Sequence, residues 1–282
     1  MASNLRRVVT ILLSALSIGF ARAGEDSLTF APLPMEAAEV VVGQWKPFLN
    51  YLERKLGIRL RIDYSQSNEE ILEKFRTGKI DLAYLGPLPY VVLKEGFPAA
   101  LPVVKFNEAN GQPAYACAVV ALAERKLDMR KIRGMQVALT QPLSTCGYLS
   151  AEGLLRQSGG TLEANHYRYL AMHDAVALAV VRGDYDAGVL KSAIGMKYAH
   201  LGLTTLAETP PLPSLALVAN STRVSAETVD RLRTALVEAD SAVRASWGDN
   251  IRHGAVLATD KDYDPVRKLL RGQRRIPPKG NF

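Results

Sequence analysis

Short apolar runs alternate with amphipathic stretches along most of the chain, and this alternation constrains the fold more than any other sequence feature. The apolar runs are typical of buried strands, and the stretches between them have the apolar spacing of helices. A repeated strand–helix order predicts a parallel sheet with helices on both of its faces. The order runs from residue 27 to residue 94 and begins again after Tyr115, so the sequence predicts two α/β lobes.

The pattern gives one run of strands and helices before residue 95 and a second run after residue 115. The predicted strands are 27–33, 58–64, 80–84, 116–123, 135–140, 166–170, 186–190 and 215–219. The predicted helices are 37–56, 68–77, 90–94, 145–157, 174–181, one long helix at 225–246 and a short basic one at 264–270. Asn68 is expected to cap the helix that begins there.

The second lobe is expected to be inserted into the first. Lobe one would comprise residues 24–114 together with 214–282, and lobe two would comprise residues 115–213. Ligands of open α/β sheets bind beyond the carboxyl ends of the strands. Two such lobes placed face to face therefore predict a ligand cleft between them.

The first 23 residues have the features of a secretory signal peptide. Arg6 and Arg7 precede an apolar stretch of 13 residues, 8–20, and Ala21-Arg22-Ala23 forms a cleavage site. An uncleaved anchor is the alternative, but the stretch is shorter than the roughly 20 residues that a membrane span needs. We therefore expect an exported, periplasmic protein, with a net charge lowered from +7 to +4 by loss of the leader.

Several classes of function have no sequence support. The chain has no nucleophile elbow, phosphate-binding loop, dinucleotide fingerprint or zinc-protease motif. Its four histidines and two cysteines do not have metal-ligand spacing. No basic stripe interleaved with aromatic residues indicates nucleic-acid binding. We therefore expect neither an enzyme, nor a cofactor, nor a bound metal.

The segment 142–147 lies between a predicted strand and a predicted helix. Free backbone N–H groups at a helix start, together with the helix dipole, attract anions. The hydroxyls of Ser144 and Thr145 can donate to the same oxygens. The alternative is an ordinary helix cap without a ligand, which serine and threonine often supply.

Two further segments could line the cleft. Gly86-Pro87 ends a strand of lobe one, and this turn is expected to face the Ser144–Thr145 loop; an ordinary strand–helix connection is the alternative. His173-Asp174 begins a helix of lobe two, where His173 could donate an imidazole N–H. A histidine with a purely structural partner is the alternative there. Trp45 could wall the cleft, although core packing is the usual role of such a residue.

These residues resemble the phosphonate-type substrate-binding proteins of ABC importers, a group of two-lobed periplasmic binding proteins. The matching stretches are 46–57, Gly78-Lys79-Ile80-Asp81-Leu82-Ala83 with Gly86-Pro87, Tyr115, Ser144-Thr145-x-Gly147, and His173-Asp174 with Gly183 and Asp186. The resemblance extends from about residue 28 to about residue 240. The Ser-Thr loop together with the His-Asp pair is its most specific part.

The resemblance implies that Ser144, Thr145 and residue 146 hold a tetrahedral oxyanion, with Tyr115 and His173 donating from the walls. It also implies closure of the lobes on the ligand, delivery to a membrane permease and no catalysis. Two positions depart from the family pattern, because Cys146 replaces the usual serine and Asn68 replaces a pocket tyrosine. Acids for a ligand amine are not evident, so phosphite, a simple alkyl phosphonate or another oxyanion is favoured.

The cysteines allow a different hypothesis. Cys117 shares a strand face with Tyr115, and Cys146 lies in the predicted anion-binding loop, residues 142–147. Both thiols could therefore converge on the cleft. Soft thiolates bind thiophilic elements, and the arrangement resembles that of an arsenite-binding sensor that works with a membrane histidine kinase. Buried free cysteines or a disulfide within the lobe are the structural alternatives.

Overall fold

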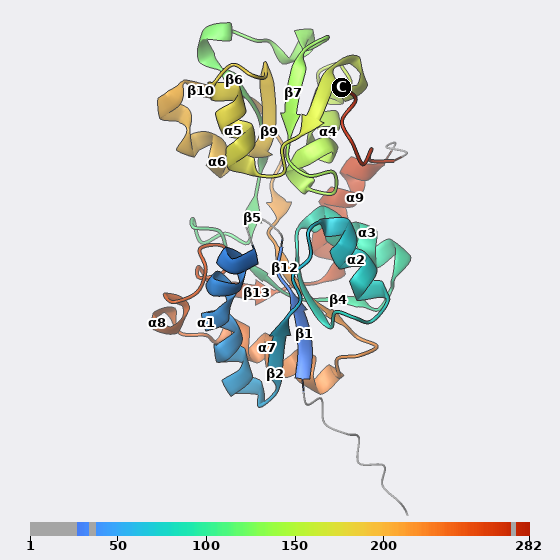
Figure 1. Cartoon of the computed structure of the whole chain (residues 1–282), viewed down its shortest axis with the longest axis vertical. Helices are drawn as coiled ribbons and strands as arrows, with labels where there is room; N and C mark the ends of the chain where they lie inside the picture. The colour runs from blue at the N-terminus through green and yellow to red at the C-terminus, as the bar shows by residue number, and fades with distance from the viewer. Residues whose placement is uncertain (1–26, 34–37, 272–274) are drawn as a thin grey trace, which may run out of the picture.

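The computed structural model of this chain describes residues 27–33, 38–271 and 275–282. The expected leader peptide at 1–23 lies outside these residues. The described chain forms two α/β lobes, one above the other, joined by thin connections (Figure 1). The two-lobed architecture expected from the sequence is therefore confirmed. Within the described residues, no helix combines the length and the apolar character needed to cross a membrane.

The two large sheets draw their strands from different parts of the chain. The six-stranded sheet has the order β13-β4-β12-β3-β1-β2. Its strands are β1 (Ser27–Ala31), β2 (Arg59–Ile62), β3 (Leu82–Leu85), β4 (Ala100–Phe106), β12 (Ala216–Asn220) and β13 (Ala255–Leu257). The five-stranded sheet has the order β10-β6-β9-β7-β8. Its strands are β6 (Cys117–Leu122), β7 (Gln136–Leu139), β8 (His166–Tyr169), β9 (Ala187–Lys191) and β10 (Leu203–Glu208).

Both sheets are mixed rather than wholly parallel. β1 pairs in parallel with β2 and β3, whereas β12 pairs antiparallel with both β3 and β4. The reason is the connection between the lobes. β4 carries the chain out of the first lobe and β12 brings it back, so the two strands must run in opposite directions.

The connection itself is a two-stranded ribbon. β5 (Ala114–Tyr115) pairs antiparallel with β11 (Leu212–Pro213) between the lobes (Figure 1). A third connection comes from the end of the chain. Asn281 donates its N–H to the Tyr167 carbonyl and accepts the Tyr167 N–H on its side chain, at 3.1 and 2.7 Å. Residues 275–282 thereby lie along β8, the edge strand of the five-stranded sheet.

Helices cover the sheets of both lobes. The first sheet carries α1 (Ala38–Leu56), α2 (Asn68–Arg76), α3 (Pro87–Gly96), α7 (Ala226–Val237), α8 (Ser241–Arg244) and α9 (Asp264–Leu270). The second carries α4 (Ser150–Gln157), α5 (His173–Val181) and α6 (Ser192–Lys197). α1 shows why these residues form helices, because Val41, Trp45, Phe48 and Leu52 recur at helical spacing and are buried against the sheet.

Two details of the helix prediction are wrong. The long helix expected at 225–246 is divided into α7 and α8, because the Asp240 carboxylate accepts the Ala242 N–H and starts a new helix. The cap of α2 is Ser67, whose hydroxyl accepts the Glu70 N–H at 3.2 Å. Asn68 is instead the first helical residue, and its side chain is buried.

We predict that Asp81→Ala will destabilise the first lobe. The buried Asp81 carboxylate accepts the Thr29 N–H at 2.8 Å and pairs with Arg223 at 2.6 Å. Without it a backbone donor and a guanidinium lose their acceptor, so the free energy of unfolding should fall by about 2–4 kcal/mol. Chemical denaturation measures the change.

Asp230→Ala is the matched control, because the Asp230 side chain is 73% exposed and its ion pair with Arg233 lies on the surface. This substitution should change the free energy of unfolding by less than about 0.5 kcal/mol. Equal losses in the two variants would show that the Asp81 contacts do not stabilise the lobe.

Candidate functional site

A cavity of about 510 Å³ lies between the lobes and is lined by residues of both. Seven of the eight residues expected to bind a ligand line it: Asn68, Gly86, Tyr115, Ser144, Thr145, Cys146 and His173. The eighth, Cys117, is fully buried and does not line the cavity. Residues from 68 to 173 therefore meet at one place because the fold directs loops of both lobes toward the same opening.

The segment after β7 forms a kinked turn rather than the start of a regular helix. The π-helical turn η3 (Thr145–Leu149) precedes α4, and Cys146 and Gly147 have non-helical backbone angles within it. A Cβ atom on Gly147 would lie 2.6 Å from the Gln141 carbonyl oxygen, so only glycine fits. The predicted helix at 145–157 is therefore regular only from residue 150 onward.

The kink leaves hydrogen-bond donors without protein acceptors. Ser144 donates its N–H to the Gln141 carbonyl and Gly147 donates to the Ser144 carbonyl, both at 3.0 Å. Between them, the N–H groups of Thr145 and Cys146 have no acceptor among the described residues. Within the same part of the chain the Ser144 hydroxyl also makes no hydrogen bond. Three adjacent donors thus remain available on residues that line the cavity.

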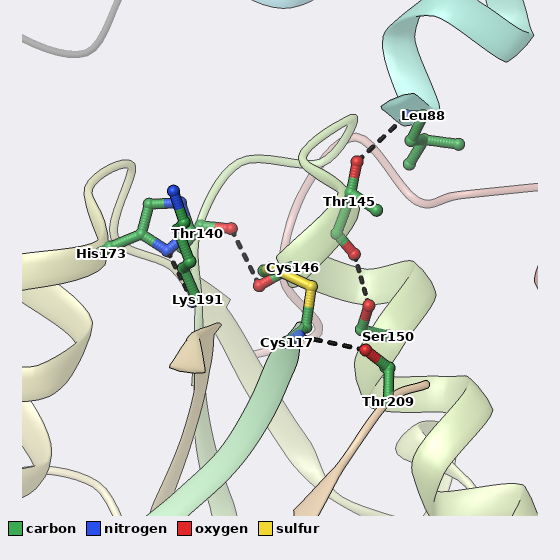
Figure 2. Close-up of a disulfide and its surroundings, with 9 residues drawn as sticks. All are labelled: Leu88, Cys117, Thr140, Thr145, Cys146, Ser150, His173, Lys191 and Thr209. Atoms are coloured by element: carbon green, nitrogen blue, oxygen red, sulfur yellow. Dashed lines mark hydrogen bonds between the residues drawn. A yellow bond between two sulfur atoms is a disulfide. The ribbon is translucent and has the colours of Figure 1, made fainter. Parts of the chain in front are cut away.

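The carbonyls of this turn are, in contrast, held from behind. The Thr145 carbonyl accepts the Ser150 hydroxyl at 2.6 Å, and the Cys146 carbonyl accepts the Thr140 hydroxyl at 3.2 Å (Figure 2). These contacts fix the orientation of the two peptide groups. The turn therefore presents donors and withholds acceptors.

Thr145 contacts the opposite lobe. Its hydroxyl accepts the Leu88 N–H from the first turn of α3 at 3.0 Å, and its side chain is 3% exposed (Figure 2). Gly86, which precedes α3, lies against the same hydroxyl. The Thr145 hydroxyl also hydrogen-bonds the Tyr115 phenol. Thr145 therefore joins the lobes in this conformation, while the Gly86–Pro87 turn faces the loop across the cleft.

Tyr115 remains a neutral hydrogen-bond donor. Burial raises the pKa of its phenol, and this outweighs the lowering effect of the hydrogen bond with Thr145. The ring also lies beneath the Lys191 ammonium, 5.2 Å from its nitrogen to the ring centre. A phenol that keeps its proton at neutral pH can donate to a negative oxygen.

Cys117 and Cys146 form a disulfide (Figure 2). No free thiol is therefore present in the described chain, which includes both cysteines. A disulfide sulfur cannot act as a thiolate ligand, so the hypothesis of a thiophilic, arsenite-like ligand is wrong, and the kinase-linked sensor that depended on it loses its basis. The disulfide instead attaches the 142–147 loop to β6.

His173 is a neutral donor of defined tautomer. Its Nδ1 accepts the Lys191 N–H at 3.0 Å, which leaves the proton on Nε2. Burial, and to a smaller extent the positive charge of Lys191, lower the pKa of the imidazole to about 4. The ring lines the cavity and therefore offers a donor without a positive charge.

Asn68 lies on the lobe-one side of the cavity and reaches the other lobe. Its amide nitrogen donates to the Gln141 side chain at 2.8 Å, and its amide oxygen is buried without a partner among the described residues. This contact between Asn68 and Gln141 spans the cleft beside the 142–147 loop. Asn68 therefore helps to define the closed edge of the cavity.

Lys191 lines the cavity but was not predicted from the sequence. This residue ends β9 and pairs with Glu108 from the opposite lobe at 2.5 Å. A lysine directly after a buried strand was the available signal, but its partner lies 83 positions away in the sequence. No group of three or more metal-ligating side chains occurs in the described ranges.

Comparison with known proteins identifies relatives over most of the chain. Residues 30–263 match the family described as "ABC transporter, phosphonate, periplasmic substrate-binding protein". The chain is 26% identical over 274 residues to the phosphate-import protein PhnD of Mycolicibacterium smegmatis, covering 86% of this chain and 85% of the relative. It is 24% identical over 182 residues to the phosphonates-binding periplasmic protein of Escherichia coli, covering 62% and 53%.

Solved structures share the fold. PhnD1 from Prochlorococcus marinus in complex with methylphosphonate superposes with a TM-score of 0.75 at 18% identity, covering 88% of this chain and 98% of that one. The aliphatic sulphonate-binding protein SsuA from Escherichia coli gives a TM-score of 0.58 at 14% identity, with 91% and 90% covered. Both likenesses establish the two-lobed fold.

We predict that Cys117→Ala with Cys146→Ala will lower the free energy of unfolding. The disulfide links residues 29 positions apart, and loop-closure entropy assigns a link of this length roughly 3–4 kcal/mol. Guanidinium denaturation of the variant and of the reduced wild type measures the loss. Unchanged stability in both would show that the bond adds nothing to the fold.

The histidine makes the stability pH-dependent. The unfolded chain protonates His173 near pH 6.5 and the folded chain only near pH 4. Protons therefore favour the unfolded state in this window, and stability should fall as the pH drops from 6.5 toward 4, by up to about 1.4 kcal/mol per pH unit. His173→Gln should lose this component in denaturation experiments at pH 7.5, 6 and 5. Parallel pH profiles for the two proteins would contradict the assignment.

Proposed function

This chain belongs to the family of phosphonate-type periplasmic substrate-binding proteins of ABC transporters, and we propose that it binds a small oxyanion of the phosphonate or phosphite class. The proposed site is the cavity between the lobes. The observation that carries the proposal is the set of unpaired donors at Ser144, Thr145 and Cys146.

These donors suit a tetrahedral anion because three of them lie on adjacent residues of one loop. Backbone N–H groups at a helix start stabilise negative oxygens through their dipoles. The Ser144 hydroxyl adds a third donor, and the neutral groups of Tyr115 and His173 line the same cavity. When each of these groups donates a hydrogen bond to the anion, the protein donors replace the water molecules of its hydration shell. The negative charge of the bound anion is then still stabilised.

The positive charge of Lys191 is already neutralised by Glu108, so Lys191 acts on the site through its neighbours. Its ammonium is paired with Glu108 and lies over the Tyr115 ring. Its backbone N–H fixes the His173 tautomer. We therefore propose that Lys191 positions Tyr115 and His173. The donors of the 142–147 loop would stabilise the negative charge of the ligand.

Asn68, Gly86 and Cys146 complete the proposed ligand-binding set. Gly86 lies against the Thr145 hydroxyl at the start of α3, and Asn68 closes the edge beside Gln141. Cys146 contributes its backbone N–H, because its sulfur is bonded to Cys117 and has no proton to donate. Cys117 acts through that bond and not as a ligand-contacting residue.

The lobes are proposed to be residues 24–114 with 214–282, and residues 115–213. The sorting of the strands between the two sheets and the β5–β11 ribbon support these boundaries. The tail at 275–282 belongs to lobe one by sequence but contacts lobe two. Ligand would enter with the lobes apart, and the Leu88–Thr145, Asn68–Gln141 and Glu108–Lys191 contacts would form on closure.

Membership of the family supports a proposed biological role. We propose that residues 1–23 direct export to the periplasm, where the protein delivers its ligand to an ABC permease. The relatives named above are import and binding proteins, which supports delivery rather than chemical conversion.

Ser144→Ala tests the site. The substitution removes one donor to a charged oxygen, so the dissociation constant for methylphosphonate should rise about tenfold to a hundredfold. Titration calorimetry with phosphite, methylphosphonate, phosphate and sulfate identifies the anion class.

Ser241→Ala is the control, because Ser241 is an exposed serine at the start of α8. This substitution should leave the affinity for methylphosphonate unchanged. Saturable binding of none of these anions, or equal affinities in the wild type and Ser144→Ala, would refute the proposed function.

A further inference from the structure

We infer that the ligand of this cleft carries an uncharged apolar substituent larger than a methyl group, so that the substrate class is organophosphonates with aryl or branched alkyl groups. The inference rests on the proposed function and deepens it. It is drawn from the wall opposite the anion loop, from the size of the cavity and from the pairing of every charged side chain that lines it.

The two walls of the cavity differ in chemistry. The donors lie on lobe two, at Ser144, Thr145, Cys146 and His173. Lobe one faces them mainly with aromatic and aliphatic side chains, namely Leu33, Val41, Trp45, Tyr84, Leu215 and Trp247. Its polar lining residues are Gln44, Asn68, Asp249 and Asn250, and the Trp247 indole N–H is buried without a partner among the described residues. An anion held by lobe two would therefore direct its remaining substituent toward an apolar surface.

The apolar wall is rigid because it is continuous with the core of lobe one. The rings of Trp45 and Tyr84 pack with their centres 4.9 Å apart, and Trp247 packs on Phe48 at 5.1 Å. Trp45 is 8% exposed and Trp247 is 4% exposed. Side chains held in this way cannot move into the cavity to fill it around a small ligand.

The cavity is larger than an inorganic oxyanion requires. Its volume of about 510 Å³ equals that of about 17 water molecules, at about 30 Å³ each. Phosphite and methylphosphonate have only a few non-hydrogen atoms and would leave most of this space to water. Water against an apolar wall is displaced favourably by an apolar group, so a larger substituent gains affinity here.

The charged side chains that line the cavity disfavour a ligand with an ammonium group. Three line it, and each already has a partner of opposite sign: Asp174 with Lys197 at 2.7 Å, Asp249 with Arg252 at 3.1 Å, and Lys191 with Glu108. A ligand ammonium needs an unpaired carboxylate when it is desolvated. None is offered by the described lining residues, so an aminoalkyl phosphonate is disfavoured.

The test compares four phosphonate ligands by titration calorimetry on the full mature chain: phosphite, methylphosphonate, phenylphosphonate and 2-aminoethylphosphonate. At about 0.3 kcal/mol for each added non-hydrogen atom, phenylphosphonate should bind about tenfold more tightly than methylphosphonate. 2-Aminoethylphosphonate should bind more weakly than phenylphosphonate by at least the same factor.

Leu215→Phe narrows the cavity from the apolar wall, because Leu215 is half-buried and lines it. It should remove the advantage of phenylphosphonate while changing methylphosphonate affinity less than about threefold. Leu33→Phe, at a lining position that follows β1, should have the same effect on the two affinities. Thermal melting verifies that each variant is folded. Val237→Phe, at a 44% exposed position on α7, should change neither affinity.

The outcomes separate this inference from the function on which it rests. Tight phosphite or methylphosphonate binding without a gain for phenylphosphonate would overturn the inference and leave the oxyanion site intact. Equal effects of Leu215→Phe on both phosphonates would overturn it as well. Loss of binding to all four ligands would refute the proposed function itself.

Discussion

Two backbone N–H groups without acceptors, those of Thr145 and Cys146, are the constraint on which the site depends. A buried amide without a partner costs free energy, so a chain that keeps two of them beside each other needs a bound group or water to satisfy them. The surrounding residues preserve this condition. Gly147 permits the kink, hydroxyls of Thr140 and Ser150 hold the carbonyls, and the disulfide attaches the loop to β6.

The division of the site between two lobes gives each lobe a separate task. Lobe two supplies the donors on a loop supported from behind, and lobe one supplies an aromatic wall that is part of its own core. The lobes meet through polar contacts, such as Leu88 with Thr145, and through an apolar cluster in which Cys146 and Leu149 pack with Leu88 and Tyr263 of lobe one. These contacts would have to separate for the cleft to open, while each half of the site stays within its own lobe.

The sequence predicted much of the fold and of the candidate site. The alternation of apolar and amphipathic segments predicted the two lobes, and the loop at 142–147 was identified from its position between a strand and a helix. Local chemistry was sufficient there because a helix start exposes N–H groups wherever it lies. The long helix at 225–246 was predicted wrongly, since a cap at Asp240 competes with propensity and is decided by local geometry.

The amino-acid sequence by itself determined the types of the helices and strands and which groups of the 142–147 loop can donate hydrogen bonds. It also placed at position 147 the glycine that the kink requires. These features depend on residues that are close together in the chain. The partners across the cleft were decided only by the tertiary structure. Thr145 meets Leu88, Lys191 meets Glu108 and Cys117 meets Cys146 because packing brings distant segments together. The aromatic wall of the cavity is likewise formed by residues from 45 to 247, which no local pattern relates to one another.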